Sequence, residues 1–106
     1  MVKQIFLVKK KPGLPFDEFK KYYLEHHVPL VIKNMTGIRK YIINFVLQRG
    51  KETPYDSIGE IYWDDIESIK EFAKSDTYKN IVVPDEEKFI DRASIIVNLT
   101  EETIQK

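Results

Sequence analysis

The chain has 106 residues, no cysteine, and 17 Lys and Arg residues against 17 Asp and Glu residues. This length predicts one domain over residues 1–106, and the formal charge of zero argues against a protein that binds nucleic acid or an anionic membrane. The lack of cysteine rules out disulfides, thiolate metal ligands and a thiol nucleophile, and it favours a cytoplasmic location. No apolar run is long enough for a signal peptide or a membrane span, so we expect neither.

The first predicted elements are a strand over residues 2–10 and a helix over residues 15–34. The strand is β-branched and aromatic at its centre, and the helix carries apolar residues at steps of three and four. Pro29 lacks an N–H group, so we expect the helix to bend beside His26 and His27. A break of local rules of this kind is enriched at functional sites.

The rest of the chain predicts three further strands and a second helix. A strand over 38–48 is followed by a polar loop over 49–54 and a strand over 56–63. A helix capped by Asp64 or Asp65 comes next, and then a less regular segment over 75–87 with a break at Pro84. The chain ends with a helical turn over 86–91, a strand over 93–99 and a polar tail over 100–106. This β-α-β-β-α-β order predicts an α+β, ferredoxin-like fold with a four-stranded antiparallel sheet and two helices on one face.

Two of the predicted strands are apolar on both faces, at residues 42–46 and 95–97. Two helices cover only one face of a sheet, so the other face would be left as a large exposed apolar patch. We therefore expect a homodimer, in which a second copy of the sheet covers this face through a two-fold interface.

The run His27-Val28-Pro29-Leu30, at the end of an aromatic-rich first helix, resembles the signature of the EthD-like family within the dimeric α+β barrel superfamily. Three further stretches resemble the family in the same order, at residues 37–41, 55–63 and 87–91. The resemblance covers nearly the whole chain. It implies a ferredoxin-like monomer whose sheet closes into a barrel with the sheet of a second copy. Members of the family include enzymes that act on lactones and polyketide-like aromatics, and many proteins of unknown activity.

His27 and Glu60 are the first candidate catalytic residues. His27 shares the stripe of the first helix that faces the sheet, and an imidazole there titrates near neutrality and can move protons. The alternative is a core histidine that is hydrogen-bonded to a carboxylate or a carbonyl of the protein. Glu60 lies in an apolar strand, where a carboxylate is costly to bury unless it is paired. Its alternative role is a rim position or an ion pair with Arg39 or Lys40 of the neighbouring strand.

Asp91 is the third candidate, because a carboxylate that accepts a ring N–H would orient His27. Its alternative role is a helix-end or turn residue that pairs with Arg92. His26 is turned about 100° from its neighbour and is expected at the rim. Because the two histidines point apart, and no third histidine or cysteine exists, we expect no metal site. No phosphate-binding loop or dinucleotide fingerprint occurs, so we expect no organic cofactor.

Aromatic and amide side chains predict the lining of a small, mostly apolar pocket. The candidate ligand-binding residues are Tyr23, Tyr41, Asn44, Tyr62 and Phe89. For the aromatic members the alternative is packing in the core or the dimer interface, and for Asn44 it is an amide bonded within the sheet.

Two functions fit this pattern. The first is a cofactor-free enzyme that acts on a small lactone, quinone or polyketide-like aromatic, with His27 as the acid/base of an isomerisation, cyclisation or decarboxylation. The second is a binding or accessory protein of a catabolic pathway, which holds a small apolar or aromatic molecule without turnover. A purely structural role is a third reading. The sequence does not separate the first two, since both require an aromatic pocket with a polar anchor.

Overall fold

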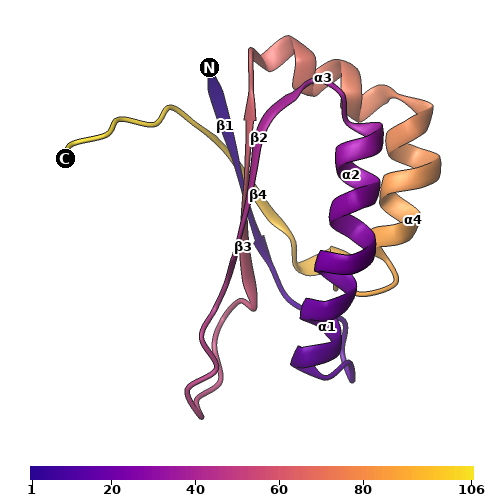
Figure 1. Ribbon diagram of the computed structural model, residues 1–106, viewed down its shortest axis with the longest axis vertical. Coiled ribbons are helices and arrows are strands. Elements are labelled where there is room, and N and C mark those ends of the chain that lie inside the picture. Colours follow the sequence, from indigo (N-terminus) through magenta and orange to yellow (C-terminus); the bar gives the residue numbers. More distant parts are fainter.

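The computed structural model describes residues 1–106, and its four strands form one sheet with the helices on one side (Figure 1). The elements are β1 (Val2–Val8), α1 (Phe16–Tyr22), η1 (Tyr23–His27), α2 (Val28–Asn34), β2 (Ile38–Phe45), β3 (Ser57–Trp63), α3 (Ile66–Lys74), η2 (Tyr78–Val82), α4 (Val83–Glu86), η3 (Arg92–Ser94) and β4 (Ile96–Thr100). Here η1 and η2 are π-helical and η3 is a 3₁₀ turn.

The strand order across the sheet is β2-β3-β1-β4, and every neighbouring pair is antiparallel. This is the predicted ferredoxin-like arrangement, so the predicted fold class is confirmed. The last strand begins at Ile96 rather than at residue 93, because Arg92–Ser94 form a turn first. The second strand ends at Phe45, before the long loop that leads into β3 and projects from the lower end of the sheet in Figure 1.

The helical regions differ from the sequence prediction in one repeated detail. In the first helical region the π-helical segment η1 ends just before Pro29, which lies in the first turn of α2. A hydrogen bond from the Val28 N–H to the Tyr23 carbonyl closes the π turn. The segment predicted as irregular is also helical, because η2 and α4 carry the chain through residues 78–86 in the same way. Its corresponding bond runs from the Val83 N–H to the Tyr78 carbonyl, one residue before Pro84. Each proline therefore follows a wider turn, which accommodates a residue with no N–H.

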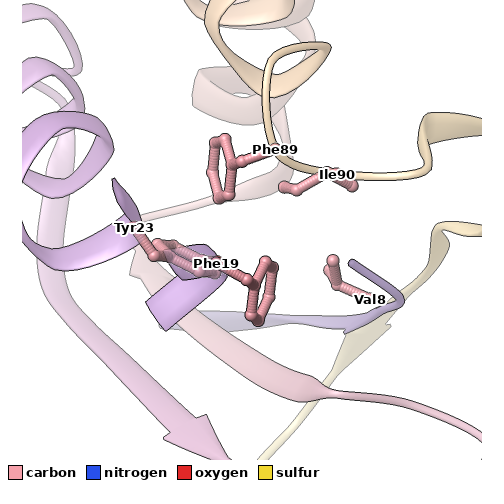
Figure 2. Close-up of a cluster of buried hydrophobic side chains, with 5 residues drawn as sticks. All are labelled: Val8, Phe19, Tyr23, Phe89 and Ile90. Carbon is pink, nitrogen blue, oxygen red and sulfur yellow. The ribbon is translucent and has the colours of Figure 1, made fainter. Parts of the chain in front are cut away.

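Two hydrophobic clusters lie between the sheet and the helices. The first joins Phe19 and Tyr23 of the first helical region to the end of β1 and to the segment after α4 (Figure 2). Its members are Val8, Phe19, Tyr23, Phe89 and Ile90. The second cluster comprises Val31, Met35, Ile61 and Trp63.

The two faces of the sheet differ in cover. Along β3, residues Ser57, Gly59, Ile61 and Trp63 are buried beneath the helices. The alternate residues Ile58, Glu60 and Tyr62 point to the opposite face, on which no helix packs (Figure 1). The register aligns Ile58 and Glu60 with Leu7 and Ile5 of β1, so this outer face carries a group of apolar residues beside the polar residues around Glu60. None of the helices is long and apolar enough to cross a membrane.

Candidate active site

A cavity of about 320 Å³ lies between the helix-covered face of the sheet and the helices. Of its 20 lining residues 16 are hydrophobic, so the cavity favours an apolar occupant. The four polar lining residues are Gln4, His27, Glu86 and Arg92. They form the chemical inventory of the site, and three of them come from the helical side.

His27 is the last residue of η1 and is only 3% exposed. Its Nδ1 atom lies 2.8 Å from Oδ2 of Asp85, which is itself 7% exposed and belongs to α4. No protein group bonds Nε2, and Ser57 Oγ is the only fully buried side-chain polar atom without a partner. Nε2 is therefore the ring nitrogen left for a molecule in the cavity.

Asp85 is held on both of its oxygens. While Oδ2 faces His27, Oδ1 accepts a hydrogen bond from the Tyr22 hydroxyl at 2.5 Å. Burial and the bond to Asp85 raise the pKa of Tyr22 to about 12, so the phenol stays a donor. The carboxylate is thus fixed in orientation by α1 and presents its second oxygen to the imidazole.

Burial lowers the pKa of His27, against the opposing influence of the Asp85 carboxylate. The imidazole is therefore neutral at pH 7. With a carboxylate on Nδ1, the proton of the neutral ring resides on Nδ1, and Nε2 carries the lone pair. This is the arrangement of a general base.

Arg92 and Glu86 form a second polar group in the cavity lining, in addition to His27. Arg92 donates from Nε to Oε1 of Glu86 at 3.1 Å and from Nη2 to the Tyr78 hydroxyl at 3.3 Å. Burial raises the pKa of Glu86, although the positive charge of Arg92 works against this shift. Glu86 follows Asp85 directly, so one turn of α4 supplies a carboxylate to each polar group.

Two tyrosines also line the cavity. The Tyr23 ring meets the imidazole edge-on, with centroids 5.6 Å apart. Burial raises the pKa of Tyr23 to about 12, and burial also raises the pKa of Tyr41. Both hydroxyls therefore keep their protons at neutral pH.

The structure brings some of the predicted residues together and separates others. His27, Tyr23 and Tyr41 line the cavity. Phe89 packs against the imidazole, with centroids 4.9 Å apart, but lies in the core cluster and outside the lining. The predicted bond from His27 to Asp91 is wrong, because Asp85 occupies that position. Asp91 instead donates its backbone N–H to the Lys9 carbonyl at 3.0 Å, and Arg92 pairs with Glu86.

Glu60, Asn44 and Tyr62 lie on the outer face of the sheet, away from the cavity. Asn44 donates to Oε2 of Glu60 at 2.8 Å, and the Lys3 ammonium pairs with the same carboxylate. The partner of Glu60 is therefore Lys3, not Arg39 or Lys40, and Arg39 pairs with Asp64. These bonds lower the pKa of Glu60, with Lys3 the larger cause.

Asp85, Glu86 and Arg92 were not singled out by sequence reasoning. One signal for Asp85 is present: tyrosine, valine and proline recur at the same spacing in 23–29 and 78–84. Both stretches are a π turn followed by Val-Pro, and Asp85 then occupies the place that Leu30 has after the first one. No group of three or more His, Cys, Asp or Glu side chains is gathered closely enough to hold a metal ion.

The chain matches a family model and resembles several solved structures. The model of the family described as the EthD domain matches residues 11–93. An ethyl tert-butyl ether D (EthD) family protein from Bacillus halodurans C-125 is 26% identical, with a TM-score of 0.74 over 97% of this chain and 99% of its own. HapK from Hahella chejuensis is 10% identical, with a TM-score of 0.75 over 97% and 93% of the two chains. A dimeric protein of unknown function and ferredoxin-like fold from Bacteroides fragilis NCTC 9343 is 16% identical, with a TM-score of 0.68 over 95% of each chain. No curated protein matches the sequence.

Proposed function

The chain belongs to the EthD family, and on that premise we propose that it is a homodimer whose cavity binds a small apolar or aromatic molecule and whose His27 acts on it as an acid/base. The reaction is an isomerisation, cyclisation or decarboxylation of a lactone, quinone or polyketide-like aromatic, without a metal or organic cofactor. The observation that carries the proposal is the 2.8 Å contact between His27 Nδ1 and Asp85 in the wall of an apolar cavity.

The proton step follows from this contact. Nε2 takes a proton from an acidic C–H or O–H of the ligand, and the imidazolium that forms is stabilised by the adjacent Asp85 carboxylate. The same nitrogen then returns the proton to another atom of the ligand, so isomerisation and cyclisation need no other reactant. In a site of low water content, hydrogen-bond donors stabilise a negative charge on the ligand, and Tyr23 and Tyr41 line the cavity as protonated phenols that could supply them.

The homodimer is supported by the outer face of the sheet. Ile5, Leu7, Ile42 and Ile58 lie on this face by their register, and Ile96 beside them is 44% exposed. An apolar sheet face of this extent is normally covered. The similar protein from Bacteroides fragilis is described as dimeric, which agrees with cover by a second copy.

A binding role without turnover is the alternative, since the same cavity would hold a ligand in either case. The distinction rests on Nε2. A binder needs only the volume and polarity of the imidazole, whereas a catalyst needs its proton exchange.

The chain offers its own reporter for the test. Trp63 is the single tryptophan, it is 2% exposed and it lines the cavity, so its fluorescence should respond to an occupant. We would screen small lactones and phenolic compounds by thermal shift and Trp63 fluorescence, and then analyse each bound compound for products. His27→Asn should lower turnover by about 10²- to 10⁴-fold with little change in fold.

His26→Asn is the matched control. His26 is exposed and stacks on the Tyr22 ring with centroids 4.9 Å apart, so its loss should leave turnover within a factor of two or so of the unmodified protein. Binding without product in the unmodified protein would favour the binding role. Equal effects of the two substitutions on turnover would contradict a catalytic role for His27.

A further inference from the structure

We propose that the ligand of the cavity carries a carboxylate, and that Arg92 binds it. This inference rests on the proposed function, because it concerns the same cavity, and it adds the chemical class of the ligand. Arg92 is the only cationic side chain among the 20 lining residues. In a cavity whose lining is otherwise mostly hydrophobic, a cation selects the position and charge of whatever binds.

The Arg92 guanidinium has N–H groups that no protein atom accepts from. A guanidinium carries five N–H bonds, and here one goes to Glu86 and one to the Tyr78 hydroxyl. The side chain is 35% exposed, so it is neither enclosed by protein nor free in solvent. Its planar array of remaining N–H groups suits a carboxylate, which accepts two parallel hydrogen bonds from one guanidinium.

Glu86 holds Arg92 in place without satisfying it. Its side chain is 16% exposed and reaches only the Nε edge of the guanidinium, at 3.1 Å. The Tyr78 hydroxyl fixes Nη2 from η2, and Arg92 itself begins the 3₁₀ turn that precedes β4. The guanidinium is therefore preorganised from three elements, as a binding group is, and its mobility is lower than that of an unpaired surface arginine.

The position of the pair relates the anion to the chemistry. Asp85, which orients His27, and Glu86, which orients Arg92, are consecutive residues of α4. Arg92 and His27 line the same cavity, so a ligand whose carboxylate lies on Arg92 keeps its remaining atoms in the cavity that His27 lines. The cavity volume of about 320 Å³ is at the lower end of small-molecule sites, which suits an acid with one or two rings.

The test compares matched acids and amides. Isothermal titration calorimetry would give the Kd of 2-naphthoate and 2-naphthamide, and of benzoate and benzamide, for the unmodified protein. We expect each acid to bind about 10- to 100-fold more tightly than its amide, because only the acid forms charge-assisted hydrogen bonds with Arg92. Arg92→Gln should remove this difference and leave the Kd of the amide nearly unchanged.

Two further variants separate the charge from the scaffold. Arg39→Gln is the control, since Arg39 forms an exposed ion pair with Asp64 at 2.6 Å, and it should leave every Kd unchanged. Glu86→Gln should tighten the acids and not the amides, because it removes the anion that competes for Arg92. A merely structural Arg92 would give no such gain.

The outcomes distinguish this inference from the function on which it rests. Amides that bind as tightly as acids, or an Arg92→Gln variant that weakens both equally, would overturn the carboxylate assignment and leave the cavity as a binding site. If none of the four compounds binds while a lactone or phenolic compound from the screen does, the carboxylate assignment is overturned and the proposed function stands.

Discussion

His27 and Asp85 are 58 positions apart in the sequence, yet their side chains meet at 2.8 Å. The histidine belongs to η1 and the aspartate to α4, two helical regions on the same side of the sheet (Figure 1). The pair therefore forms only when these two regions are packed together. Tyr22 adds a second contact between these regions, because its hydroxyl donates a hydrogen bond to the other oxygen of Asp85 at 2.5 Å.

The first prediction concerns the charge on Asp85. Asp85→Asn removes the negative charge that opposes the effect of burial, so the pKa of His27 should fall further below its ordinary value. Stability should fall by about 1–3 kcal/mol, since the amide cannot accept from both Tyr22 and His27 as the carboxylate does. An NMR titration of the imidazole protons measures the pKa. Asp64→Asn, at an exposed carboxylate, is the control, and an unchanged His27 pKa in Asp85→Asn would argue against the pairing.

The second prediction is a pH dependence of stability. The pKa of His27 is lowered on folding, so below about pH 6.5 the unfolded chain binds a proton at this residue and the folded chain does not. The unmodified protein should therefore lose stability as the pH falls from 6.5 toward the folded-state pKa, by at most about 1.4 kcal/mol per pH unit from this residue.

Urea unfolding of the unmodified protein and of His27→Asn between pH 7.5 and 5 measures this contribution. Glu86, whose pKa is raised by burial, contributes with the opposite sign over the range above its unfolded pKa, but it is present in both proteins and cancels in the difference. Stability curves that run parallel over the whole range would show that His27 titrates normally.

The third prediction concerns the outer face of the sheet. Ile58 lies on this face in the central strand β3, beside Leu7 of β1 and Asn44 of β2. Ile58→Glu would place an unpaired charge inside the proposed dimer interface and should convert the dimer to monomer at micromolar concentration. Sedimentation velocity measures the mass. Ile32→Glu, on α2 at 61% exposure, introduces the same charge elsewhere and should leave the dimer intact. A monomeric unmodified protein would refute the dimer.

The fourth prediction concerns packing in the first cluster. Phe19 is fully buried between Tyr23 and Phe89, with ring centroids 5.7 and 5.9 Å away (Figure 2). Phe19→Ala should cost about 3–5 kcal/mol of unfolding free energy. Phe72→Ala, at a partly buried ring that lines the cavity, should cost less. Chemical denaturation measures both, and equal losses would contradict the placement of Phe19 at the centre of the core.

Strand alternation and helical period were enough to predict the fold class, because β3 alternates in burial at every residue and the first helix repeats its apolar residues. The same parity places Glu60 with Ile58 and Tyr62, as the structure has them. It does not say which of the two faces the helices cover. Each face of β3 mixes the two kinds of side chain: the covered face holds Ser57 as well as Trp63, and the uncovered face holds Ile58 as well as Glu60. Side-chain polarity along this strand is therefore a weak guide to the cavity.

The missed partner of His27 has a different physical cause. A π turn inserts one residue into the helical repeat, so the apolar period that marks a helix is broken at η2 and the segment looks irregular. Asp85 lies in α4, just after η2, and is 7% exposed, although a carboxylate in a segment that looks irregular is usually on the surface. Its pairing with His27 depends on how the two helical regions pack against each other, which no local pattern encodes.

The most direct test of the account is the protonation state of the His27 ring, measured by ¹⁵N NMR with and without a bound cavity ligand. The chain has only two histidines, so the His26→Asn variant gives unambiguous signals for His27. We predict a neutral ring at pH 7 with its proton on Nδ1, and a change in the Nε2 chemical shift when the ligand binds. A proton on Nε2 in the neutral ring, or an Nε2 signal that a saturating ligand leaves unchanged, would contradict the account.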